Sequence, residues 1–134
     1  MALLLGLTSC GPREYKSYAL EDFCDTAQAG EYVTVSGVLK IPETILDYDR
    51  SYGLLLVEDL NQPQPFVHIG IPIGKGNNEM QTLVDNFTLD DVKIQADDGS
   101  SLTHGDAVIV SGFFGGACGA GNSDIDVKRI EIQP

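Results

Sequence analysis

The sequence predicts a small, mainly β protein whose strands close into a five-stranded barrel. The first observation is the stretch 32–41, YVTVSGVLKI, in which apolar and polar residues alternate with the period of two typical of a half-buried strand. The second is Gly37, which falls on the apolar face of that stretch. A residue without a side chain weakens a flat strand, so we interpret Gly37 as a sharp bend at a barrel corner. Gly112 follows another alternating stretch in the same register.

Four further stretches are predicted as the remaining strands. They are 52–59 (YGLLLVED), 66–73 (FVHIGIPI), 107–114 (AVIVSGFF) and 124–132 (DIDVKRIEI). We interpret NQPQP at 61–65 as a turn, because Pro63 and Pro65 lack the N–H that a β-ladder requires. The alternation of the last stretch slips at Lys128 and Arg129, which predicts a β-bulge there.

Two helices are predicted beside these strands. An N-terminal helix is expected between Ser17, as a cap, and Gly30, with Leu20 and Phe23 at helical spacing, and it would close one end of the barrel. A second helix is predicted over 78–87, between the third and fourth strands. Its apolar residues recur at i, i+3, i+4 and i+7, the stripe of an amphipathic helix. They are Met80, Leu83, Val84 and Phe87.

Length and charge restrict the domain organisation and the partners. At 134 residues the chain has room for one domain, which we place at 18–134, and neither an internal repeat nor a second domain is visible. Twenty acidic residues against eight basic ones give a formal net charge of −12. Such a surface repels phosphate backbones, so nucleic acid is not expected as a partner.

The first twelve residues, MALLLGLTSCGP, form an apolar run that is too short to span a bilayer as a helix. Residues Leu7–Cys10 resemble the lipobox of bacterial lipoproteins, although no Lys or Arg precedes the run as it does in that family. The resemblance implies removal of 1–9 as a signal peptide, acylation of Cys10 and a lipidated tether over 10–17. The expected location is extracytoplasmic and membrane-anchored, at the outer membrane facing the periplasm if the host is Gram-negative. The alternative is a buried N-terminal strand with an isolated cysteine.

Two cysteines remain once Cys10 carries lipid. In an oxidising compartment Cys24 and Cys118 are a candidate disulfide pair. The alternative is two separate thiols, one packed under the first helix and one in a glycine-rich loop.

The predicted strands resemble an OB-fold barrel through VTVSGVL, YGLLLVED, PFVHIGI, GDAVIVSG and DIDVKRIEI. Their layout is similar to the tRNA-anti-like and the small periplasmic bacterial OB-fold families. The resemblance implies a Greek-key barrel that acts as a binding module, with its ligand on the face of the second and third strands and on the flanking loops. On this sequence the implied surface, bordered by Cys118, consists of Asp47, Tyr48, Asp49, Arg50, Tyr52, Phe66, His68, Asn122 and Asp124.

The residue types on this surface favour binding over catalysis. Tyr48, Tyr52 and Phe66 are candidate stacking platforms for a sugar ring or a base, with packing against a neighbouring strand as the alternative. Arg50 stands between aspartates, unlike the basic groove of a nucleic-acid binder. Neither His68 nor His104 has a second ligand at a zinc spacing, and no catalytic motif is recognised, so neither a metal nor another cofactor is expected.

The sequence therefore predicts a lipid-anchored OB-fold binding module of the bacterial cell envelope, with a protein, peptide or glycan as ligand. A small calcium-dependent envelope hydrolase and a structural assembly subunit are the alternatives from other classes. An OB-type nucleic-acid binder is disfavoured by the net charge of −12.

Overall fold

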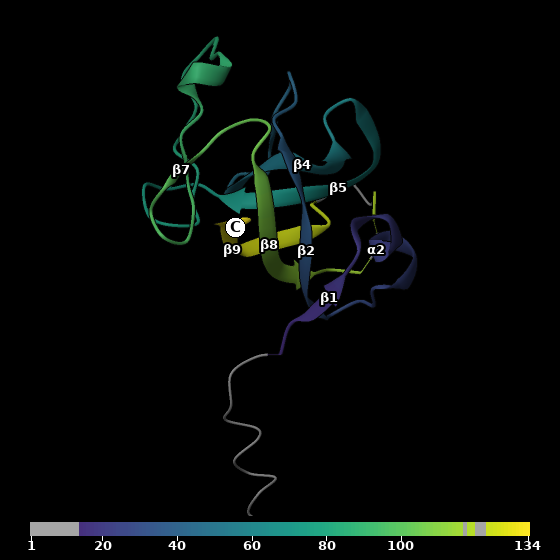
Figure 1. Cartoon of the computed structure of the whole chain (residues 1–134). Helices are drawn as coiled ribbons and strands as arrows, with labels where there is room; N and C mark the ends of the chain where they lie inside the picture. The colour runs from purple at the N-terminus through teal and green to yellow at the C-terminus, as the bar shows by residue number, and fades with distance from the viewer. Residues whose placement is uncertain (1–13, 117, 120–122) are drawn as a thin grey trace, which may run out of the picture.

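The computed structural model describes residues 14–116, 118–119 and 123–134. The predicted signal peptide with Cys10, and Asn122, lie outside the described residues. Figure 1 shows strands wrapped around one core, with a short helix at one side. The elements in chain order are β1 (Lys16–Tyr18), α2 (Leu20–Thr26), β2 (Tyr32–Lys40), β3 (Leu46–Asp47), β4 (Ser51–Asp59), β5 (Gln62–Pro72), the 3-10 helix η1 (Leu89–Asp91), β6 (Ile94–Gln95), β7 (Ser101–Leu102), β8 (Ala107–Phe114) and β9 (Ile125–Ile132).

Five long strands close the barrel. β2 pairs with β4, β4 with β5, β8 with β9 and β8 with β2, all antiparallel, while β5 and β9 are parallel. Around the barrel the strands follow the closed order β2-β4-β5-β9-β8-β2. Counted as the first to fifth barrel strands along the chain, this is the order 1-2-3-5-4-1. This confirms the predicted mainly β, five-stranded barrel, and the topology is compatible with an OB-like fold.

The corner predicted at Gly37 is present. Strand β2 pairs with β8 from Tyr32 to Val38 and then with β4 from Val38 onward, so it changes partner immediately after Gly37. A Cβ at position 37 would lie 2.9 Å from the carbonyl oxygen of Val57. The absence of a side chain therefore lets β2 cross close to β4.

The bulge predicted in the last strand is also confirmed. Ser111 of β8 pairs with Arg129, but the next residue, Gly112, pairs with Val127, which leaves Lys128 as the extra residue of β9. A bulge increases local twist, and twist is needed for a sheet to close on itself.

Helix α2 confirms the predicted N-terminal helix, although it is shorter than expected. It packs against β2, β4 and β5, and it buries Leu20 and Phe23. The Phe23 ring meets the Phe114 ring edge to face, with centroids 4.8 Å apart. Ser17, the expected cap, instead lies in β1, which pairs with β2, and Ala19 precedes the helix.

The helix predicted over 78–87 is wrong. This segment is irregular, and its backbone groups bond to other segments: Asn78 N–H donates to the Gln95 carbonyl and Gln81 N–H to the Lys93 carbonyl. Asn78 and Asn86 also have positive φ angles of 64° and 55°, outside the right-handed helical region. Met80 is fully buried and Val84 is 60% exposed, so the apolar stripe does not lie on one covered face.

The turn predicted at 61–65 is wrong as well, because β5 already begins at Gln62. The ladder with β4 runs from Phe66 opposite Val57 directly to Gln62 opposite Asp59. The register therefore shifts in the stretch that contains Pro65, and an irregularity of this kind is where a strand tolerates proline.

Within the part of the chain that the structure describes, no helix has both the length and the apolar character needed to cross a bilayer.

Candidate functional site

The candidate site is a hollow on the outer face of β4 and β5. In this register Gly53 stands opposite Gly70, and Leu55 stands opposite His68, all on the side away from the core. The chain between β2 and β4 folds over this face, and its strand β3 pairs Leu46 with Gly53. The hollow encloses about 210 Å³. It is lined by Pro42, Thr44, Leu46, Gly53, Leu55 and His68.

Gly53 makes room for an aromatic ring at one side of this hollow. A Cβ at position 53 would lie 2.9 Å from the ring carbon Cε2 of Tyr48. Burial, together with the negative charge of Asp124, raises the pKa of the Tyr48 hydroxyl. Tyr48 therefore keeps its proton at neutral pH and can act as a hydrogen-bond donor beside the hollow.

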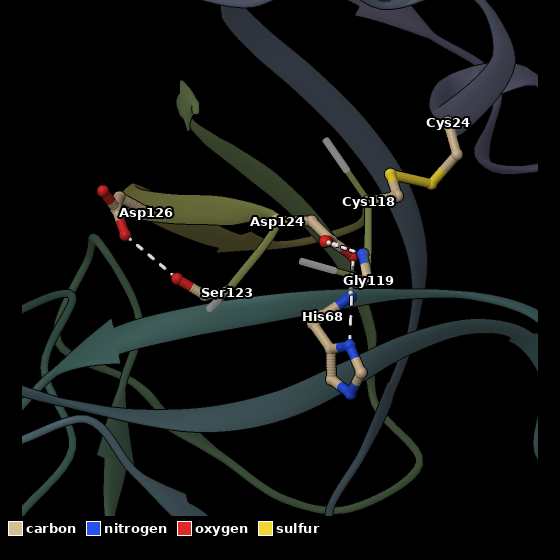
Figure 2. Close-up of polar contacts among 7 residues, drawn as sticks. All are labelled: Cys24, His68, Cys118, Gly119, Ser123, Asp124 and Asp126. Atoms are coloured by element: carbon tan, nitrogen blue, oxygen red, sulfur yellow. Dashed lines mark hydrogen bonds and ion pairs between the residues drawn. A yellow bond between two sulfur atoms is a disulfide. The ribbon is translucent and has the colours of Figure 1, made fainter. Parts of the chain in front are cut away.

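Asp124 holds the loop before β9 against β5. Its carboxylate is buried, with Oδ2 accepting the His68 backbone N–H at 2.9 Å and Oδ1 accepting the Gly119 N–H at 3.0 Å. The His68 ring nitrogen Nδ1 lies 4.0 Å from Oδ2, and Figure 2 shows the carboxylate between His68 and Gly119. Because only 3% of Asp124 is exposed, we assign it to holding the backbone beside the hollow, not to contacting a partner bound there.

The three predicted stacking platforms have different environments. Phe66 is 37% exposed and meets the His68 ring edge to face, with centroids 5.2 Å apart. Tyr48 is half-buried. Tyr52 lies in the core at 6% exposure, where its hydroxyl oxygen accepts the Leu83 N–H at 3.0 Å, so the interpretation of Tyr52 as a platform is wrong.

The loop before β4 carries an exposed, mostly acidic tip. Asp47, Asp49 and Arg50 are all exposed. The Asp47 carboxylate accepts the Asp49 N–H at 2.8 Å, and Asp49 has a φ of 81°, so Asp47 stabilises a tight turn. These three residues belong to the same loop as Pro42, Thr44 and Leu46, but they do not line the hollow themselves.

Sequence reasoning missed Pro42, Thr44, Leu46 and Leu55 as lining residues. Leu46 is 46% exposed and belongs to β3, which pairs with β4 beside the hollow. A usable signal was the pair Gly53 and Gly70, because glycine within a strand often marks the close approach of another segment. The segment that approaches Gly53 is β3, and only the structure shows that the chain between β2 and β4 folds back to place it there.

A disulfide joins Cys24 of α2 to Cys118 of the loop before β9, with the Cα atoms 5.8 Å apart. Figure 2 shows this bond next to Asp124. The ligand atoms of Cys24, Cys118 and Asp124 all lie within 4.8 Å of one another. His104 lies elsewhere and accepts the Ile41 N–H on its Nδ1 at 2.9 Å, which is a structural role.

The barrel and its outer hollow define a β-barrel protein whose topology is compatible with an OB-like fold and whose β4–β5 face is partly covered. Comparisons of the chain with protein-family models, with curated proteins and with solved structures gave no match.

Proposed function

We propose that this chain is a binding module of the bacterial cell envelope that holds a protein or peptide segment on the outer face of β4 and β5. The observation that carries the proposal is the hollow between Leu46, Leu55 and His68. OB-fold barrels bind their ligands on this face and its flanking loops, and the barrel here is compatible with that fold.

The size of the hollow favours part of a larger ligand. Its volume of about 210 Å³ is below the range of about 300 to 1,000 Å³ that sites for whole drug-sized ligands have. One apolar side chain anchored between Leu46 and Leu55 is a better match, with the rest of the partner lying along the sheet face.

The charges around the hollow favour a basic partner. The loop that covers it exposes Glu43, Asp47 and Asp49 against the single cation Arg50. With a chain charge of −12, these carboxylates attract Lys and Arg and repel phosphate. The proposed ligand is therefore a segment with an apolar anchor next to basic residues. A glycan is the second candidate, because the exposed Phe66 ring offers a face for a sugar.

Affinity capture from detergent-solubilised envelopes tests whether a partner binds at the hollow. The wild-type chain should retain a partner that Leu46→Asp loses at least tenfold, because the substitution places a charge in the apolar hollow. Val84→Asp is the matched control, since Val84 is 60% exposed and does not line the hollow. Equal capture by the Leu46 and Val84 variants would contradict binding at this face. Salt-sensitive binding of single-stranded nucleic acid by the wild type would contradict the charge argument.

The membrane anchor is proposed from the lipobox-like residues 7–10 alone. Metabolic labelling of the full-length chain with a palmitate analogue should mark the wild type and leave Cys10→Ser unmarked. Several acyl chains on one residue give stable anchoring, so the wild type should also fractionate with membranes. An unlabelled wild-type chain would rule the anchor out.

A further inference from the structure

Two sulfur atoms and a buried carboxylate meet where α2 contacts the loop before β9. The Sγ atoms of Cys24 and Cys118 and a carboxylate oxygen of Asp124 lie within 4.8 Å of one another. The three residues come from distant parts of the chain, so the fold itself brings them together. In the oxidised protein the sulfurs are bonded to each other.

We propose that reduction of this disulfide opens a site for Zn²⁺ or a similar thiophilic divalent cation, with Cys24, Cys118 and Asp124 as ligands. Zn²⁺ takes thiolate and carboxylate ligands in tetrahedral geometry, and three protein ligands leave one position for water. Zn–S bonds of about 2.3 Å place two sulfurs about 3.8 Å apart in such a geometry. In the disulfide the two sulfurs are bonded and closer than this, so reduction must let them separate, and the carboxylate oxygen already lies within 4.8 Å of both.

Asp124 is prepared to act as the oxygen ligand. A carboxylate has about four lone-pair sites, and the His68 and Gly119 N–H groups occupy only two of them. These two hydrogen bonds fix the carboxylate in place. Its only ion-pair partner among the described residues is the His68 ring at 4.0 Å, and no lysine or arginine neutralises it there. A divalent cation would compensate this buried charge.

The disulfide is open to reduction because Cys24 lies on the exposed side of α2 and Cys118 is only partly buried. A dithiol reductant transfers two electrons and two protons to the S–S bond and becomes a disulfide itself, which leaves two cysteine thiols. Metal binding then releases the two thiol protons to solvent as the thiolates coordinate the cation. The cation can therefore bind only after the disulfide has been reduced. The proposal does not rest on partner binding at the hollow, although Asp124 also accepts the backbone N–H of His68, which lines it.

The test uses Co²⁺ as a spectroscopic probe for the full-length chain carrying Cys10→Ser, which removes the only other cysteine. After dithiol reduction and removal of the reductant, one equivalent of Co²⁺ should give thiolate charge-transfer bands and tetrahedral d–d absorption. The oxidised chain should give neither signal. Added Zn²⁺ should displace Co²⁺ and abolish both.

Variants then separate the proposed ligand set from general chelation. Asp124→Asn should weaken Co²⁺ binding tenfold or more, whereas Asp25→Asn, an exposed residue next to Cys24, should leave the affinity unchanged. Circular dichroism of the reduced variants, before Co²⁺ is added, establishes whether each is folded under the conditions of the assay. Because Asp124→Asn also removes a structural acceptor, Cys118→Ser serves as a second variant and should lose the charge-transfer bands. Absence of stoichiometric Co²⁺ binding, unaltered affinity in Asp124→Asn, or a reduced chain that unfolds and is not refolded by Co²⁺ would overturn the proposal.

Discussion

Replacing Gly112 with alanine is expected to destabilise the barrel by about 3 kcal/mol or more, at or above the upper end of the usual cost of overpacking. An alanine Cβ at this position would lie 2.1 Å from the carbonyl oxygen of Asp126. That oxygen belongs to the backbone of β9 just before its bulge, so it cannot rotate away as a flexible side chain would. Relief requires β8 and β9 to separate at this point, which opens the barrel.

Urea denaturation followed by circular dichroism measures this loss directly. Gly115→Ala is the matched control, because a Cβ there meets nothing within 4 Å and its φ is not positive. We expect the control to stay within about 0.5 kcal/mol of the wild type, as exposed substitutions usually do. Equal stabilities for the two variants would contradict the close approach of β8 and β9.

Removing the disulfide is expected to have the second large effect. The bond closes a loop between residues 94 positions apart, and the chain-entropy model gives such a loop a stabilisation of up to about 4 to 5 kcal/mol. Folding free energies are commonly only about 5 to 15 kcal/mol, so the double variant Cys24→Ser/Cys118→Ser loses a large share. In urea its unfolding midpoint should fall. The m-value should rise, because the unfolded chain becomes less compact without the cross-link.

The double variant also removes both thiolate ligands of the proposed cation site, so a bound cation cannot replace the lost constraint. Cys10→Ser is the control, since it removes the one cysteine outside the pair and should not change the midpoint. A double variant with the wild-type midpoint would show that the bond adds nothing to stability.

The barrel could be predicted because its strands are described by local patterns. Alternation of apolar and polar residues with a period of two indicates a strand with one buried face. The alternation is interrupted at Gly37 and slips at Lys128, and these are the places where the strands bend or bulge. These features depend on neighbours in sequence, so the chain alone carries them.

The segment 78–87 shows where local patterns are insufficient. Met80, Leu83 and Phe87 have helical spacing, and all three contribute to the core or pack against it. Yet the backbone of this region bonds to 93–95, and Met80 forms isolated bridges with Ile73 and Ile94. Tertiary pairing thus overrides the helical pattern, and a single sequence does not reveal these distant partners.

The candidate site was predictable only in outline. The face of the second and third strands followed from the OB-fold resemblance, and Phe66 and His68 do lie there. The prediction for Tyr52 was wrong because this residue pairs with Ile71 on the inward face of the sheet. Its hydroxyl can be buried there because the oxygen accepts the Leu83 N–H. Leu46 was missed because its importance arises from the loop folding back onto Gly53.

Photo-crosslinking in intact cells tests the central claim, which is that a partner occupies the hollow on β4 and β5. A benzoylphenylalanine at position 46 lies at the hollow, and the same residue at position 84 lies on an exposed site that does not line it. We expect a discrete crosslinked adduct from position 46 and none from position 84. An adduct from position 84 alone, or the same adduct from both positions, would contradict it.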